Sequence, residues 1–332
     1  MYLIGNVNSG QNYKVNSFGK NVLPKRNSVS GDNAAFCARN TMSESNVDPK
    51  CTKKGLIAAG IAFATVLAGV GIVIISRGRN KKLANKALAE IPDELKTIFA
   101  KLKDEKGEAF FNKGYNQIKK FMKLEATAPE KVIINANETS GFSIKGGFSP
   151  NLNSINYDNG VLKMNKAKQL DMLAHELKHS EQFSSMIRTE GVGIEKLAEA
   201  LAENAVKNSI SESSFDFFFR GAYQNAVREG KAEEFLAAAK KNTAKTFLEE
   251  FRVNYEKVLN LPKISSDSIE GIKALEQINA IKDYEGANFI GIAGDTYKNN
   301  PLEVEAYAFG EKISNYFEKF MKYQKYYKPS VQ

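Results

Sequence analysis

The sequence predicts an α+β domain, mostly helical with a small β-sheet, preceded by one membrane-spanning helix. Three observations predict this class. An uncharged apolar run occupies residues 55–75, helical spacing of apolar residues dominates after residue 83, and strand-like stretches between polar turns are confined to residues 132–157. Helices followed by a short sheet and further helices fit an α+β domain better than an alternation of strands and helices.

The net positive charge of the chain is confined to its N-terminal part. Residues 1–82 contain 12 of the 47 Lys and Arg residues and 3 of the 38 Asp and Glu residues, which accounts for the whole formal charge of +9. Residues 83–332 contain 35 residues of each sign, so the bulk of the chain has no basic footprint for nucleic acid. The polar residues 1–52 show no apolar period, and we expect them to be disordered because they cannot bury enough surface to offset their ordering entropy.

A single membrane-spanning helix is predicted over residues 53–79. The run from Gly55 to Ile75 contains no charged residue, and about 20 apolar residues suffice to cross the hydrocarbon core of a bilayer. The basic residues on both sides of the run argue against a buried core helix, and the 54 residues that precede it argue against a cleaved signal peptide. We therefore expect a single-pass membrane protein. The flanking charges leave open on which side of the membrane the following domain lies.

Residues 83–332 show the pattern of a folded domain. Helical spacing of apolar residues covers Pro92 to Leu102, Ala109 to Leu124 and nearly everything after Ala167. Strand character is found in three short stretches that Asn, Gly and Ser turns separate: Val132–Ala136, Gly141–Lys145 and Asn153–Tyr157.

The cysteine and histidine counts restrict the chemistry that this domain can support. Cys37 and Cys51 are the only cysteines of the chain and both precede residue 83, which excludes a disulfide framework, a Cys-ligated zinc module and an iron–sulfur site. The sequence leaves open whether these two cysteines pair. The chain has two histidines, so a site that needs three of them cannot exist.

Both histidines lie in one pentapeptide, HELKH, from His175 to His179. Residues four apart on a helix share one face, so two imidazoles can reach the same tetrahedral metal ion. Glu176 lies beside that face, where it could take a proton from a metal-bound water. The surrounding residues 167–188 contain neither Gly nor Pro, which favours the helix that this arrangement requires. The pattern predicts zinc ligation by the two imidazoles; the alternative is an accidental match in a helical protein without zinc.

A catalytic zinc site needs a third protein ligand beside an open position. Because the histidines are exhausted, this ligand must be a carboxylate. The best candidate segment is NPLEVEAYAFG, residues 300–310, in which Pro301 fits a helix N-terminus. Glu303 and Glu305 flank the apolar stripe of this helix about 200° apart, so only one of them can point at the metal. Periodicity does not choose between them, and both could instead be solvated carboxylates that the helix dipole favours.

The two motifs together resemble the gluzincin metallopeptidases, whose second motif has the form E-x-E-A-D in membrane-anchored peptidases of the HtpX kind and in ImmA/IrrE-like proteins. This resemblance implies a zincin-like metallopeptidase domain and makes Glu303 the third zinc ligand. The pattern has Asp or Asn where this chain has Tyr307, a position that supports a zinc-bound His in those families. The 123 residues between His179 and Glu303 imply a helical insertion at about residues 190–295.

The expected activity is zinc-dependent hydrolysis of peptide bonds in a peptide or protein substrate. Zn²⁺ held by His175, His179 and Glu303 would activate water, with Glu176 as the general base. Tyr297, Tyr307 and Tyr157 are the candidates for a hydroxyl that stabilises the oxyanion. The segment from Gly146 to Tyr157 resembles the zincin edge strand that pairs with substrate, although an ordinary surface hairpin explains it equally well. The alternative function is a membrane-anchored scaffold with a catalytically inactive zincin-like domain. The sequence does not indicate the substrate or the oligomeric state.

Overall fold

The computed structural model describes residues 81–135, 146–210, 217–282, 284 and 295–328, which belong to one compact unit. The predicted polar segment 1–52 and the predicted membrane-spanning helix 53–79 lie outside the described residues. None of the helices in the described ranges is long and apolar enough to cross a membrane.

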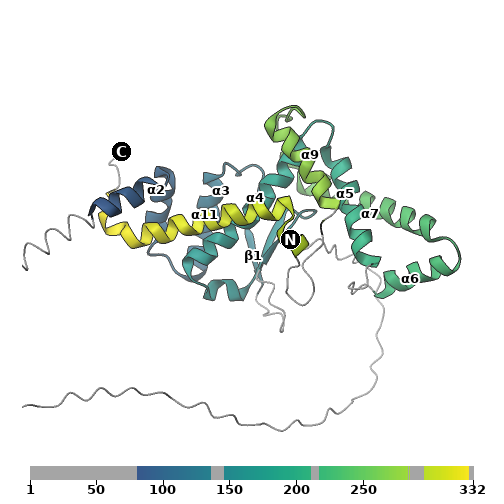
Figure 1. The fold of residues 1–332 in the computed structure, drawn as a ribbon, viewed down its shortest axis with the longest axis horizontal. Coiled ribbons are helices and arrows are strands. Elements are labelled where there is room, and N and C mark those ends of the chain that lie inside the picture. Colours follow the sequence, from purple (N-terminus) through teal and green to yellow (C-terminus); the bar gives the residue numbers. More distant parts are fainter. Residues whose placement is uncertain (1–80, 136–145, 211–216, 283, 285–294, 329–332) are drawn as a thin grey trace, which may run out of the picture. The chain divides into compact units, whose positions relative to one another are not determined.

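The described residues form a mostly helical α+β fold with a small sheet, as the sequence predicts (Figure 1). The elements before the two motifs are a helix over residues 81–89, α2 (Asp93–Leu102), α3 (Gly107–Phe121), β1 (Val132–Asn135), β2 (Gly146–Ser149), β3 (Ser154–Asp158) and the 3-10 turn η1 (Asn159–Lys163). The elements that follow are α4 (Lys166–Arg188), α5 (Gly193–Ile210), α6 (Phe217–Arg228), α7 (Ala232–Asn254), α8 (Glu256–Leu259), α9 (Ile269–Lys282), α10 (Asp295–Lys298), α11 (Pro301–Tyr323) and η2 (Gln324–Tyr326).

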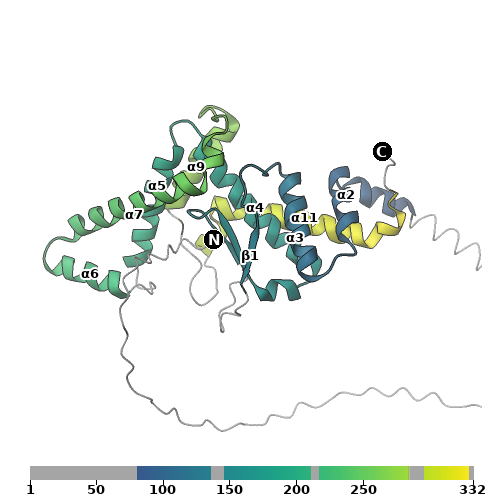
Figure 2. The same cartoon turned by 180° about the vertical axis from the view of Figure 1, so that it is seen from behind.

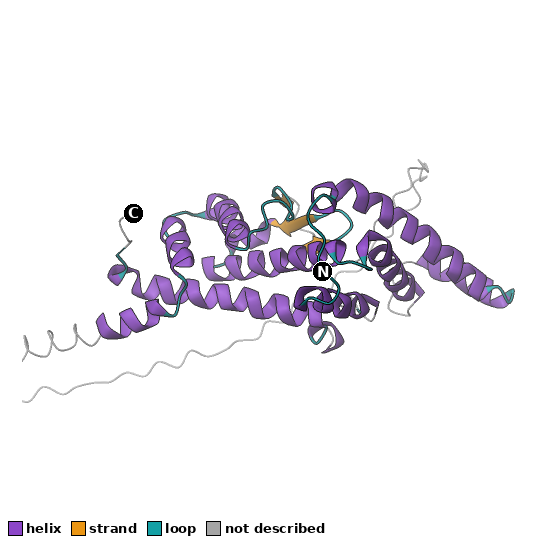
Figure 3. Ribbon diagram, turned by 90° about the horizontal axis from the view of Figure 1, so that it is seen from above, coloured by secondary structure: helices purple, strands orange, loops and turns teal. Residues whose placement is uncertain are grey.

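The strands form one small sheet that lies among the helices (Figure 3). Its strand order is β1-β3-β2, with β3 parallel to β1 and antiparallel to β2. The strands predicted at Val132–Ala136 and Asn153–Tyr157 are β1 and β3, and for the segment from Gly146 to Tyr157 the structure selects the hairpin over the single edge strand. The segment is a hairpin in which β2 lies at the edge and β3 at the centre. The side chain of Tyr157 fills the space beside Gly146, where an added Cβ would be 1.9 Å from the tyrosine ring. The edge strand β2 packs against α4, with the Phe148 and Phe183 rings 5.7 Å apart. The predicted strand at 141–145 lies outside the described residues.

The helices that contain the two motifs, α4 and α11, run side by side over much of their length (Figures 1 and 2). The predicted apolar stripe of α11 faces inward: Leu302, Ala306, Ile313, Phe317 and Phe320 are buried, and Phe309 is partly buried. On α4 the buried apolar residues include Leu170, Leu173, Leu177 and Phe183. Burial of these facing stripes is the main reason why two segments more than 100 residues apart in sequence come together.

The segment between the two motifs is helical where it is described. α5 packs on α7 and α9, α6 packs on α7, and α9 packs on both α4 and α11. The predicted insertion at about 190–295 thus consists of helices α5 to α9 in its described part, and of these helices α9 packs on the helix of the second motif.

Candidate metal centre

Helix α4 places the two histidines on one buried face. The helix begins at Lys166, where the side chain of Asn165 accepts a hydrogen bond of 2.8 Å from the backbone nitrogen of Lys168. His179 is fully buried and His175 is 8% exposed. Their Nε2 atoms lie 3.1 Å apart, so both imidazoles present the same ring nitrogen to one point. The spacing of four residues has this effect because the two side chains are one helical turn apart.

Helix α11 brings Glu303 to the same point. Asn300 caps this helix by accepting a hydrogen bond of 3.0 Å from the backbone nitrogen of Leu302, and Pro301 occupies its first turn. The Glu303 carboxylate is fully buried against the imidazoles. Its Oε2 lies 3.3 Å from Nε2 of His175, and its Oε1 lies 3.3 Å from Nε2 of His179.

The spacing of these three groups fits a tetrahedral metal ion. Bonds of about 2.0–2.2 Å from zinc to nitrogen or oxygen, at tetrahedral angles, place neighbouring ligand atoms about 3.3–3.6 Å apart. The distances of 3.1, 3.3 and 3.3 Å, of which the last two are to different oxygens of the Glu303 carboxylate, lie at or just below this range. Among the residues that the structure describes, Oε2 of Glu303 also finds no hydrogen-bond partner, and its burial costs free energy unless a cation lies against it. The two imidazoles and this carboxylate could therefore hold a metal ion.

Electrostatics keeps the Glu303 carboxyl ionised. Burial by itself raises the pKa of this group, but the neighbouring His179 and the contacts with both imidazoles lower it by more. The pKa of Glu303 consequently lies well below its ordinary value, so the group offers a negative charge to a cation.

Glu176 belongs to the same cluster, and the structure brings its carboxylate together with the two imidazoles. One of its carboxylate oxygens is within 4.8 Å of the ligand nitrogens of both histidines, and its side chain is 6% exposed. Within the described residues its Oε2 is buried without a hydrogen-bond partner. This distance limit admits Glu176 either as a direct ligand or as a carboxylate that acts on a metal ion through a water molecule.

The other acidic candidate, Glu305, does not reach the imidazoles. Its carboxylate pairs with Lys178 at 2.7 Å and with Lys273 of α9. It also accepts hydrogen bonds of 3.2 Å each from the side chains of Gln182 and Gln277. Burial raises the pKa of Glu305, but the two lysines and Gln182 lower it by more. The structure therefore distinguishes two glutamates that helical periodicity left equivalent.

Two residues that the sequence did not indicate contact the proposed ligands. The hydroxyl of Tyr284 donates a hydrogen bond of 2.8 Å to Oε1 of Glu303, and Oε1 of Gln182 lies 2.9 Å from Nδ1 of His179. Gln182 could have been suspected because it is a polar residue one turn after His179 on a buried face. Tyr284 could not, because it lies more than 100 residues from the histidines and belongs to no helix or strand.

The three tyrosines predicted as oxyanion donors have different surroundings. Tyr157 is buried and its hydroxyl already donates a hydrogen bond of 2.8 Å to the carbonyl of Met172. Tyr297 is 6% exposed and packs on Tyr284, with ring centroids 5.5 Å apart. Tyr307 packs on His175, with ring centroids 4.5 Å apart, and remains 46% exposed. Burial and the nearby Glu303 raise the pKa of Tyr307, so its hydroxyl keeps the proton that a donor needs.

The approach of α11 to α4 depends on Gly310. A Cβ at this position would lie 2.5 Å from Oδ1 and 2.7 Å from the backbone oxygen of Asp171. We expect Gly310→Ala to separate the helices, to lower the free energy of unfolding by about 1–3 kcal/mol and to weaken metal binding. Thermal unfolding and zinc titration of the full chain measure both effects. Gly221→Ala is the matched control because nothing lies within 4 Å of a Cβ there; unchanged zinc affinity in Gly310→Ala would contradict this explanation.

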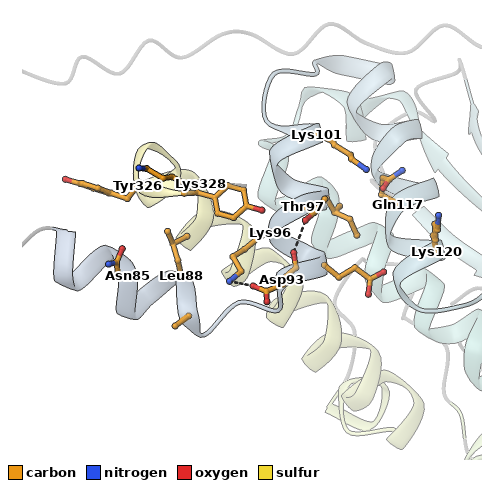
Figure 4. Close-up of a pocket in the computed structure, with 14 residues that line it drawn as sticks. Asn85, Leu88, Asp93, Lys96, Thr97, Lys101, Gln117, Lys120, Tyr326 and Lys328 are labelled. Carbon is orange, nitrogen blue, oxygen red and sulfur yellow. Dashed lines mark hydrogen bonds and ion pairs between the residues drawn. The ribbon is translucent and has the colours of Figure 1, made fainter. Parts of the chain in front are cut away.

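An open depression of about 810 Å³ lies elsewhere, between α2, α3 and the C-terminal turn (Figure 4). Its lining includes four lysines and two carboxylates, and Lys96 pairs with Asp93 at 2.5 Å. None of His175, Glu176, His179 and Glu303 lines this depression, and we assign it no part in the chemistry of the candidate metal centre.

Comparisons with known proteins do not identify the chain: no family model, no curated protein and no solved structure matches it. The fold and the site together show a mostly helical α+β domain that contains a buried His-Glu-x-x-His group, and this group could hold a metal ion.

Proposed function

We propose that this chain is a zinc-dependent metallopeptidase of the gluzincin type. The observation that carries the proposal is the convergence of Nε2 of His175, Nε2 of His179 and the Glu303 carboxylate, with separations of 3.1–3.3 Å. Two imidazoles and one carboxylate are a ligand set of catalytic rather than structural zinc sites, because a fourth position stays open for water or substrate. The zincin resemblance of the two motifs supports the same assignment.

In this proposal His175, His179 and Glu303 hold the zinc ion. When bound, the metal supplies Lewis-acid polarisation of the scissile carbonyl and a lowered pKa of water. Glu176 accepts the proton of the attacking water and later donates it to the leaving amine. Tyr307 is the best-placed hydroxyl to donate a hydrogen bond to the developing oxyanion, because it contacts His175 and stays partly exposed.

The sheet supports a peptide as the substrate. β2 is an edge strand of the described sheet and packs directly against the helix of the two histidines. The free backbone groups of an edge strand can pair with an extended peptide and align it along the site. The predicted membrane-spanning helix at residues 53–79 would anchor the domain to a bilayer, so the proposed substrates are peptides or proteins available at a membrane.

Metal analysis and peptide cleavage test the proposal together. We expect the purified full chain to retain about one zinc per molecule, to lose peptide cleavage when a chelator removes the metal and to recover it when zinc is restored. The melting temperature should fall on chelation, because ligand binding stabilises the folded state. His179→Ala should bind no zinc at concentrations that saturate the wild type.

The possible outcomes separate the competing functions. A wild-type chain that binds no zinc would contradict both a metallopeptidase and a zinc-containing scaffold. A chain that binds zinc in the site but cleaves no member of a diverse peptide library would instead support the non-catalytic scaffold, for which the high burial of the ligands is the favouring observation.

A further inference from the structure

The side-chain amide of Gln182 links the metal centre to two other parts of the fold. Gln182 lies on α4 one turn after His179 and is 3% exposed. Its Oε1 is 2.9 Å from Nδ1 of His179. Its Nε2 is 3.1 Å from the carbonyl oxygen of Leu302 and 3.2 Å from Oε2 of Glu305, both on α11.

Chemistry fixes the orientation of this amide. The carbonyl of Leu302 and the carboxylate of Glu305 can only accept hydrogen bonds, so the NH₂ group of Gln182 must face them. The amide oxygen therefore faces His179. Because an amide oxygen can only accept, Nδ1 of His179 must carry a proton. A neutral imidazole protonated at Nδ1 has its lone pair at Nε2, which is the atom that faces His175 and Glu303.

We propose that Gln182 is a positioning residue that holds His179 in the Nδ1-protonated tautomer and aims its Nε2 lone pair at the metal. This inference rests on the proposed zinc site. A hydrogen-bond acceptor on the ring nitrogen that faces away from the metal fixes both the tautomer and the rotation of a metal-bound imidazole. In this chain the acceptor is Oε1 of Gln182, which lies on α4, the same helix as the two histidines.

Glu305 in turn holds Gln182, and residues of the intervening segment hold Glu305. The Glu305 carboxylate is fixed by Lys178 on α4 and by Lys273 and Gln277 on α9. Three successive contacts, from Lys273 to Glu305, from Glu305 to Gln182 and from Gln182 to His179, therefore connect α9 to a proposed ligand. Glu305, which the sequence offers as an alternative ligand, thus acts on the site through Gln182.

The two-histidine composition makes the tautomer directly observable. In the full chain labelled with ¹⁵N at histidine, a long-range proton–nitrogen spectrum contains the signals of two rings, which a His175→Gln variant assigns. At about pH 8.5 we expect the metal-free wild type to show His179 protonated at Nδ1. Gln182→Leu should lose this signature and bind zinc about 10–100-fold more weakly, as measured by competition with a chelator.

Gln169→Leu is the matched control. Gln169 lies on the same helix and is also 3% exposed, but its amide donates to the backbone carbonyls of Leu162 and Met164, outside the network around His179. It should lose a comparable amount of stability and keep both the tautomer and the zinc affinity. A metal-free wild type with His179 protonated at Nε2 would overturn the inference, as would a Gln182→Leu variant with unchanged tautomer and affinity. Absence of zinc binding by the wild type would instead contradict the proposed function, whatever the tautomer.

Discussion

Replacement of Glu176 by Gln is expected to leave zinc bound and to lower the rate of peptide hydrolysis by about 10²–10⁴-fold. The substitution preserves the size of a side chain that is 6% exposed, so the fold and the three proposed ligands should be retained. A glutamine cannot accept the proton of the attacking water, and the loss should therefore appear in kcat rather than in metal content. Zinc content by mass spectrometry and steady-state cleavage of a fluorogenic peptide measure the two quantities.

Glu181→Gln provides the control for this variant. Glu181 lies on the same helix and pairs with Lys178, and its side chain is 37% exposed. The same chemical change at this position should alter kcat less than about twofold, because an exposed ion pair contributes little. If Glu176→Gln hydrolysed peptides at the wild-type rate with zinc in place, the general base would have to be another group.

Replacement of Glu303 by Ala should abolish zinc binding at concentrations that saturate the wild type. Loss of a group that only hydrogen-bonds to a metal ligand lowers metal affinity by roughly 10–100-fold. Removal of a ligand itself is expected to lower the affinity by more than that. The substitution would also leave a cavity at a fully buried position and remove the negative charge that faces both imidazoles. Isothermal titration of the apoprotein with zinc measures the affinity.

Glu305→Ala is the natural comparison, since it makes the same change two residues along the same helix. Its zinc affinity should fall less than that of Glu303→Ala, because Gln182 keeps the carbonyl of Leu302 as an acceptor at 3.1 Å. Its stability should fall by about 1–3 kcal/mol, because the buried amides of Gln182 and Gln277 lose an acceptor. Loss of zinc in Glu305→Ala with retention in Glu303→Ala would reverse the ligand assignment while leaving the class of site intact.

Local periodicity predicted the helices well. The absence of Gly and Pro around His175 and His179 predicted a continuous helix, and α4 covers Lys166–Arg188. Pro301 predicted the start of α11, and the apolar stripe after it predicted the buried face. The sheet was predicted less well, because short strands acquire their place from the partners with which they pair. The segment from Gly146 to Tyr157 therefore turned out to contain both an edge strand and a central strand.

The sequence alone determined that any metal site here would use the two histidines of one helix and a carboxylate from elsewhere, because residue counts and helical spacing are local properties. Only the tertiary structure decided which carboxylate lies against the imidazoles and which residues support it. Glu303 and Glu305 differ by their neighbours on α4 and α9, and those neighbours are set by the burial of apolar stripes and the close contact at Gly310. Tyr284 and Gln182 contact the proposed ligands for the same reason: packing between distant segments, which no local pattern records, brings their polar atoms within hydrogen-bond distance.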